Sequence, residues 1–565
     1  MLSKSARAAS KKRRGERNLR SNISDLFLSG SISAARARGI FQDAADAQAR
    51  HVNDLVVSED KNIHRNLLRK LVRGSAWPKP YIADITMYDP HTHNVCKKPI
   101  AVYLPHEIHW CLLRWNGSPE ARQRLLDWQS LRRDVRERVA SSVEALTLDP
   151  EALVAWGLWC DGVPVRYDRS ESLECFSLNP LINETFVQTF RLPLTCIYKS
   201  FCCKDGRTVD DLMAIFAHSF HCMREGIFPE VDFQGQPFKS SWRRKMAGRP
   251  LLAQGILAEV RGDWAMYKQE IRSCSSSAPW RDHPWSFLEL QEHMLDKSGA
   301  VSPIMAAPGI SLATFEVDWL HSCDLGVAAD FLGNCCFLVS KHMPGSSEEQ
   351  RVASLWRDIK QWYTENQTPN QFNTITKLMI RKEARKSPKL RGKAAEIRYL
   401  IPWSVDITER LFSGYPPSSE EGTCRLAAKQ IQICYSQLST ENFDPKVLAD
   451  SCKSFLLLYT ALEDLCLLEH RWRYKPKFHL WQHMCESTQS APSLYWTYDD
   501  EDWGGSLGRM SVRRGGKHVA LGLSKTVLTK FAAQNKVPSL ADLALREKST
   551  APFCEHFACC LCKGA

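Results

Sequence analysis

The sequence predicts an α/β protein with a long helical block in its second half. Three apolar runs have the length and the branched, aromatic composition of strands: Ala152–Cys160, Phe186–Leu194 and Leu251–Val260. Between the last two, Asp210–Met223 places apolar residues at helical spacing, and the text from Phe315 onward is mostly helical. At 565 residues the chain exceeds what one core usually supports, so we expect a composite domain or several domains.

Before the first strong strand, the sequence predicts a tail without an evident core and then a helical region. Residues 1–60 carry a basic run and then Ala/Arg-rich text over Ala34–Val57, which predicts a largely disordered tail with one marginal helix. Residues 61–150 place Ile108, Leu112 and Trp115 at helical spacing, which predicts a helical region.

Positive charge is concentrated at the N-terminus. The chain has 75 Lys and Arg against 63 acids, a net charge of +12. Eight bases among the first 20 residues face one acid, Glu16; they are Lys4, Arg7, Lys11, Lys12, Arg13, Arg14, Arg17 and Arg20. Such a run is typical of a nuclear import signal or a nucleic-acid-binding arm. A solvated tail and an organellar transit peptide are the alternatives. We favour a nuclear protein that meets an import receptor and DNA.

Cysteine usage and hydropathy point to a reducing compartment without a membrane. The 21 cysteines are mostly isolated within apolar text, and no secretory signal precedes them. The most apolar helical stretch, Ser454–Leu462, is far too short to span a bilayer. We therefore expect no membrane partner.

Two aspartates at strand ends are candidates for metal chemistry. Asp161 follows the first strong strand and Asp263 follows the third, 102 residues later. Carboxylates from separate elements can hold two Mg²⁺ ions for phosphoryl transfer, because Mg²⁺ prefers hard oxygen ligands. Taken alone, Asp-Gly is also an ordinary turn and Gly-Asp an ordinary loop, so spacing by itself favours the structural interpretation.

Several further segments occur with these aspartates in one order. The segments are Trp159-Cys160-Asp161-Gly162-Val163-Pro164, Gly262-Asp263-Trp264, Val317-Asp318-Trp319-Leu320-His321-Ser322-Cys323-Asp324-Leu325-Gly326-Val327, Lys393-Ala394-Ala395-Glu396-Ile397-Arg398-Tyr399-Leu400 with Pro402, and Lys475-Pro476-Lys477-Phe478-His479 with His483. Together they resemble the catalytic and accessory motifs of CACTA-like and KDZ-like cut-and-paste DNA transposases, over roughly residues 95–520.

This resemblance implies a ribonuclease-H-like core, a mixed sheet flanked by helices and interrupted by a large helical insertion. It implies metal-binding, catalytic roles for Asp161, Asp263 and Glu396, with Asp318 as the alternative third acid. The cofactor would be Mg²⁺ or Mn²⁺, and the reaction cleavage and strand transfer at DNA phosphodiesters. His321 and Asp324 would support the site, although cross-linking of helices is the commoner role for such residues.

The resemblance also sets the expected boundaries. Residues 151–275 would form the first part of the ribonuclease-H-like core and 276–390 the helical insertion. Residues 391–490 would hold the third acid and a second helical block, and 491–565 a C-terminal region with a Cys-rich tail. A homo-oligomer is compatible with this class.

A dense basic stretch immediately precedes Glu396 and is expected to contact DNA, with a solvated surface as the alternative. Its members are Arg381, Lys382, Arg385, Lys386, Lys389, Arg391 and Lys393. A similar interpretation of Arg509–Lys517 is less favoured.

Zinc is not expected. The zinc knuckle that such transposases often carry after the second acid is not recognisable around Cys274, and His479 and His483 are expected to pack. The cysteines of the C-terminal tail lack a second pair at finger-like distance, so free thiols are favoured there over a metal site.

Three functions are therefore considered. The first is an active transposase, and the second is a catalytically inactive derivative that binds DNA or protein in the nucleus. The third is a helical interaction protein with accidental motifs. Only the first requires Asp161, Asp263 and a third acid to converge.

Overall fold

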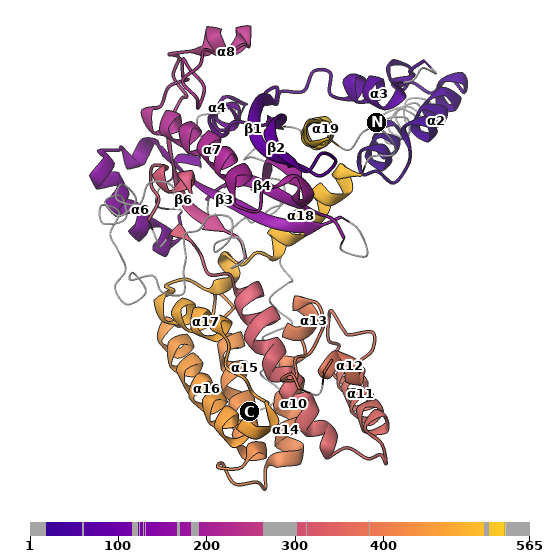
Figure 1. Cartoon of the computed structure of the whole chain (residues 1–565), viewed down its shortest axis with the longest axis vertical. Coiled ribbons are helices and arrows are strands. Elements are labelled where there is room, and N and C mark those ends of the chain that lie inside the picture. The colour runs from indigo at the N-terminus through magenta and orange to yellow at the C-terminus, as the bar shows by residue number, and fades with distance from the viewer. Residues whose placement is uncertain are drawn as a thin grey trace, which may run out of the picture. The chain divides into compact units, whose positions relative to one another are not determined.

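The structure is a computed structural model. It describes residues 19–58, 62–115, 123, 125–127, 129, 131–165, 170–181, 191–263, 302–311, 314–383, 385–512, 519–535 and 537. The chain forms two compact units (Figure 1). The first, the α/β unit, comprises Met1–Leu131, Val135–Phe315 and Asp499–Leu545. The second, the helical unit, comprises Arg132–Asp134, Glu316–Tyr498 and Arg546–Ala565, so most of it is inserted between two segments of the first.

A four-stranded mixed sheet forms the centre of the α/β unit. Its strands are β3 (Leu153–Pro164), β4 (Ser172–Pro180), β5 (Leu192–Tyr198) and β6 (Gln254–Arg261). Their order is β5-β4-β3-β6, with β3 and β6 parallel and the other neighbours antiparallel. The strands are buried over nearly their whole length, which explains why they occur as continuous apolar runs in the sequence.

The predicted strands are present, with two differences. The strand expected over Ala152–Cys160 is longer than predicted, because β3 continues through Asp161–Pro164 and pairs Asp161 with Cys175. Of the strand expected at Phe186–Leu194, residues 182–190 lie outside the described part, and β5 begins at Leu192.

The predicted helix at Asp210–Met223 is confirmed as α7 (Arg207–Glu225). It packs on the sheet through its apolar side, where the Phe216 ring lies 5.9 Å from that of Phe176. The other helices of this unit are α4 (Pro105–Trp115), α6 (Arg133–Leu146, of which Arg133 and Asp134 belong to the helical unit), α8 (Ser241–Met246), α18 (Tyr498–Ser511, from Asp499 onward in this unit) and α19 (Ala520–Gln534), with 3-10 turns η3 (Pro150–Ala152), η5 (Lys199–Phe201) and η8 (Pro303–Ala306).

The region 61–150, predicted to be helical, also contains strands. It contains a hairpin of β1 (Tyr81–Asp89) and β2 (Asn94–Val102), antiparallel over their full length. The helix expected around Ile108 and Leu112 is present as α4. In β1 every second side chain from Ala83 is buried, as in a strand with one face on the core.

Residues 19–58 differ from the expected disordered tail. They contain a helix over 19–28, α2 (Ala34–Asp46) and the 3-10 turn η1 (Asn53–Leu55), and α3 (Ile63–Leu71) follows. These helices share a small apolar core of their own, which includes Phe27, Phe41 and Leu67. Residues 1–18 of the basic run lie outside the described part.

The helical unit has a single apolar core that joins both predicted helical blocks. Its elements are the π-helix η10 (Leu320–Ala328), α10 (Ala329–Lys341), α11 (Glu348–Glu365), α12 (Lys377–Ile380), α13 (Ala394–Arg398), α14 (Ile401–Phe412), α15 (Glu420–Ser436), α16 (Pro445–Leu465), η11 (Leu467–Glu469), α17 (Pro476–Ser487) and η12 (Pro492–Leu494). The boundary expected at residue 390 therefore does not separate two bodies.

One helical stretch of the described residues, Leu320–Lys341, is long and apolar enough to cross a membrane. Of its most apolar window, 89% is buried inside the fold, which is the burial of a core helix. It is also the central helix of the helical unit, where it contacts α11, α13, α14 and α17.

Candidate functional site

The register of β3 and β6 brings the two predicted aspartates to one end of the sheet. The strands are parallel, and Trp159 pairs with Arg261. Asp161 and Asp263 each stand two residues further along. Both aspartates therefore lie toward the carboxyl ends of the strands, Asp161 within β3 and Asp263 two residues past the end of β6, and Asp263 is not in the described group of potential metal ligands that contains Asp161. Asp161 is 8% exposed and Asp263 is half-buried.

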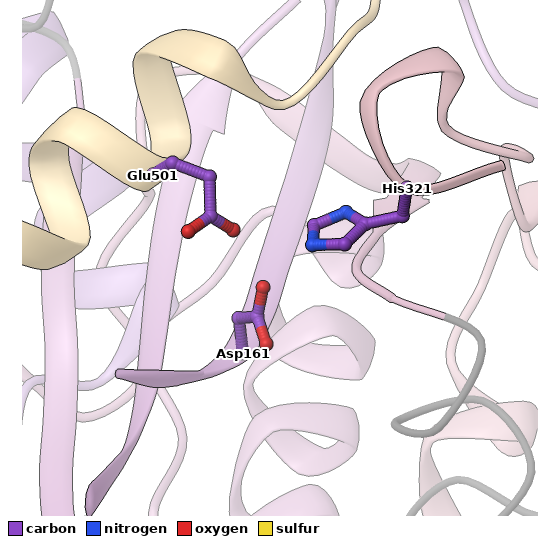
Figure 2. A group of neighbouring side chains, drawn as sticks. All are labelled: Asp161, His321 and Glu501. Carbon is purple, nitrogen blue, oxygen red and sulfur yellow. The ribbon is translucent and has the colours of Figure 1, made fainter. Parts of the chain in front are cut away.

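A third acid lies at this position and comes from α18. The carboxylate of Glu501 and that of Asp161 offer ligand oxygens within 4.8 Å of each other. Figure 2 shows the two carboxyl groups pointing toward one another, from α18 and from β3. Glu501 belongs to the acidic run Asp499–Asp502, and sequence reasoning assigned this residue no role.

A close fit between α18 and β3 positions Glu501. A Cβ atom built on Gly504 would lie 2.7 Å from Val163 Cγ2 and 3.0 Å from Trp159 Cη2. Only glycine therefore allows the helix backbone this near the strand. At the preceding residue, the Trp503 indole N–H donates to Ser177 Oγ of β4 at 2.9 Å.

Buried charges fix the start of α18. The Asp500 carboxylate accepts from Arg191 at 2.6 Å and from Arg261 of β6 at 3.4 Å. Arg261 also donates to Asn179 and forms an ion pair with Glu259. All these side chains are nearly inaccessible to water, so each charge depends on its partner. The network links α18 to β4 through Asn179, to β6 through Arg261, and to Arg191, which directly precedes β5.

The neighbouring carboxyl groups differ in their surroundings. Burial raises the pKa of Asp499, an effect that Arg191 partly offsets and that the negative charge of Asp500 strengthens. Two carboxylates as near as Asp161 and Glu501 repel each other unless a proton or a cation lies between them. Their oxygens are hard ligands, and this donor set fits Mg²⁺ or Mn²⁺.

Asp318, the predicted alternative third acid, lies in the helical unit and is fully engaged there. It accepts hydrogen bonds from the backbone N–H and Nδ1 of His321 and from the backbone N–H and hydroxyl of Thr497, at 2.7–2.9 Å. Burial alone would raise the pKa of Asp318, but the hydrogen bonds and charge of His321, with help from Thr497, lower it. The bond to Nδ1 fixes the orientation of the His321 ring, the third side chain drawn in Figure 2.

Asp324, predicted as support, is the centre of a buried polar network in the helical unit. Its carboxylate accepts from Tyr435 at 2.5 Å, Tyr498 at 2.7 Å and Arg398 at 3.1 Å. The Arg398 guanidinium lies between the rings of Trp496 and Tyr498, 4.2 and 4.1 Å from their centroids. Burial raises the pKa of Asp324. These contacts give Asp324 a structural role.

Glu396, the predicted third catalytic acid, has a local partner in the helical unit. Its carboxylate accepts the backbone N–H of Lys393, the N-cap residue of the short helix α13, at 2.8 Å. The structure does not place it in the unit that holds Asp161 and Asp263. This contact explains why an acid at this position is compatible with a purely structural role.

Some bases of the predicted DNA-binding stretch have partners within the protein, and others are exposed. Lys389 donates to the Leu325 carbonyl at 2.8 Å, and burial lowers its pKa. Arg381 donates to the carbonyls of Lys386 and Glu469, and Lys386 pairs with Glu383. The exposed members without an ion pair in the described part are Lys382, Arg385, Arg391 and Lys393.

Two other candidates from the sequence can be placed only in part. His479 and His483 face each other on α17, with their Nε2 atoms 3.0 Å apart. The segments around Cys274 and the C-terminal cysteine cluster lie outside the described residues. No family model and no curated protein matches the chain.

Proposed function

We propose that the chain is a transposase-like nuclear protein that cuts and joins DNA, with a ribonuclease-H-like core that holds two divalent metal ions. The observation that carries this proposal is the approach of Glu501 to Asp161, at the end of the sheet where Asp161 and Asp263 each follow the paired residues Trp159 and Arg261 by two positions. Three acids from two parallel strands and one helix are the donor set that two-metal phosphoryl transfer requires.

The topology supports the same proposal. Three antiparallel strands are followed by α7 and by β6, which lies parallel to β3. Phe315 then forms a parallel bridge to Val260, in the place of a short fifth strand. The helical unit follows, and α18 returns the third acid to the sheet. This is the order that the resemblance implies, with Glu501 in the place first assigned to Glu396.

In the proposed reaction the chain's own residues hold and orient the reacting groups. Asp161, Asp263 and Glu501 would bind the metal ions, which activate the attacking oxygen and stabilise the leaving oxygen when bound. Asp500, through Arg191 and Arg261, keeps α18 in place and thereby positions Glu501. The exposed bases of the stretch 382–393 would track the DNA backbone.

A metal-dependent nicking and strand-transfer assay tests the proposal. Purified full-length protein is compared with Asp161→Asn, Asp263→Asn and Glu501→Gln, and with Glu396→Gln as the matched control. We expect each of the first three to reduce the rate at least about 10³-fold, since each removes a metal ligand. Glu396→Gln should stay within a few-fold of the native rate, because its partner is a backbone N–H.

The alternative is a catalytically inactive protein that binds DNA or another protein. It predicts no metal-dependent nicking in any of these proteins, together with DNA affinity that falls with salt in all of them. Loss of activity in Glu396→Gln, with activity retained in Glu501→Gln, would return the third-acid role to the first assignment.

A further inference from the structure

We propose that one face of α3, with Arg65 and Arg69 on the helix and Arg73 in the turn after it, binds the backbone of double-stranded DNA. This inference rests on the proposed function, because it assigns the DNA of that reaction a second contact away from the acids. It concerns a helix in the region 61–150, for which the sequence predicted helical structure but no ligand.

The N-terminal helices form a module that fixes which side of α3 faces outward. Leu67 and Leu68 of α3 are buried in the module's core with Phe27 and Phe41. The His64 ring meets that of Phe27 edge to face, with centroids 5.4 Å apart. Figure 1 shows α2 and α3 close together, and the two helices are in contact. With one side anchored in this way, Arg65 and Arg69 lie on the exposed side.

Three other bases of the module have structural partners. Arg20 pairs with Asp54 and donates to the His51 carbonyl. Arg38 and Lys70 donate to the carbonyls of Val57 and Val56, at 3.0 and 2.6 Å, and so hold the loop between α2 and α3. These side chains account for the stability of the loop and are not available to a ligand.

The three proposed arginines have no such partner. Arg65, Arg69 and Arg73 are exposed, and within the described part of the chain none takes part in an ion pair or side-chain hydrogen bond. The helix α3 itself contains no acid. A row of guanidinium groups without internal counter-charges is therefore presented to solvent.

The geometry fits a DNA backbone. Arg65 and Arg69 are one helical turn apart, about 6 Å along the axis, and a helix about 10–12 Å wide fits a major groove about 12 Å wide. The guanidinium fork matches phosphate oxygens in pairs. The sequence adds seven bases and one acid within residues 1–18, directly before this module. Both features add positive charge to the N-terminal part of the sequence.

A protein partner fits this face less well. No residue of α3 is among the exposed large hydrophobic side chains of the described chain. Stable protein interfaces have an apolar, usually aromatic, centre with charges at the rim. The arginine face lacks that centre, which favours a polyanion whose affinity comes from charge.

The test is the salt dependence of DNA binding by the full-length protein. A fluorescent duplex is titrated at several salt concentrations with native protein and with Arg65→Gln/Arg69→Gln/Arg73→Gln. Each phosphate contact contributes about 0.9 to the slope of log affinity against log salt, so we expect the slope to fall by up to about 2.7. Arg and Gln have similar helix propensities, and thermal unfolding should be unchanged.

Two further variants serve as controls for the salt-dependence experiment. Lys239→Gln/Lys245→Gln/Arg249→Gln removes the same charge from exposed positions around α8 and should leave the slope within about 0.5 of the native value. Arg65→Lys/Arg69→Lys/Arg73→Lys keeps the charge and should restore most of the affinity. An unchanged slope in the glutamine variant, or an equal fall in the α8 variant, would overturn the proposal. So would competition by polyglutamate as effective as that by unlabelled duplex.

The result can be separated from that of the nicking assay. The nicking assay is run on native protein, whereas the salt slope compares native protein with the α3 glutamine variant. If native protein does not nick but the slope falls as expected, the α3 surface is supported and the catalytic proposal fails. If native protein nicks and the slope does not change, the α3 proposal fails alone.

Discussion

Replacing Gly504 with alanine should disturb the metal site through α18 without removing any ligand. The new Cβ would lie 2.7 Å from Val163 Cγ2, roughly 0.8 Å inside the usual 3.5 Å carbon contact. Because the strand is buried, we expect the helix to shift outward by a similar amount. A displacement near 1 Å in a catalytic group can reduce the rate by about 10²-fold.

Stability and activity should respond differently to this change. Overpacking costs about 1–3 kcal/mol, and replacing a helical glycine with alanine returns up to about 1 kcal/mol, so the free energy of unfolding should fall by about 0–2 kcal/mol. Gly505→Ala is the matched control, because its Cβ would meet only the end of Arg509, at an ordinary 3.7 Å. This variant should be slightly more stable and fully active.

The assay combines thermal unfolding, Mn²⁺ binding by calorimetry and nicking rate for the two alanine variants. The reasoning predicts weaker Mn²⁺ binding and slower nicking for Gly504→Ala alone. If the two variants bind Mn²⁺ equally well and nick at the same rate, the contact between α18 and β3 does not position Glu501, and the reasoning is refuted.

Three further changes test the buried networks. Asp500→Asn should lower the free energy of unfolding by about 3–5 kcal/mol, measured by denaturant titration, because it leaves the Arg191 charge uncompensated; no loss would contradict the proposed anchoring of α18. Tyr435→Phe should cost about 1–3 kcal/mol, since the Asp324 carboxylate loses a buried donor, and a neutral result in the same titration would show that the network tolerates the loss. The pKa of Asp318 is lower in the folded protein than in the unfolded chain, where it is about 3.9. The Asp318 carboxylate therefore adds to the free energy of unfolding above the unfolded pKa, and this addition disappears as pH falls through the folded pKa. Stability measured between pH 6 and pH 2.5 should thus fall more steeply for native protein than for Asp318→Asn, and parallel curves would contradict this.

Much of the sheet could be predicted from the sequence because its strands are buried on both faces. Continuous apolar runs mark β3 and β6, and helical spacing marks α7. The hairpin of β1 and β2 has no such continuous apolar run, because only every second residue of β1 from Ala83 is buried and only the last three residues of β2 are buried. The N-terminal core was missed because Ala/Arg-rich text has few large apolar residues, and Phe27 and Phe41 meet only in the tertiary structure.

The candidate site, too, could be predicted only in part from the sequence. Asp161 and Asp263 could be predicted because each follows a recognisable strand and both stand in short motifs. The third acid depends on where the chain returns after the helical unit, and Glu501 lies 238 residues beyond Asp263 (501 minus 263). No local pattern encodes that return. The motif around Glu396 instead marks the start of a helix, which a capping acid also explains.

The most direct test of the central claim is a calorimetric Mn²⁺ titration of native protein, Glu501→Gln and Glu396→Gln. If Asp161, Asp263 and Glu501 form one metal centre, native protein and Glu396→Gln should bind Mn²⁺ alike, and Glu501→Gln should bind at least about tenfold more weakly. Equal binding by native protein and Glu501→Gln, or loss of binding in Glu396→Gln, would contradict the assignment.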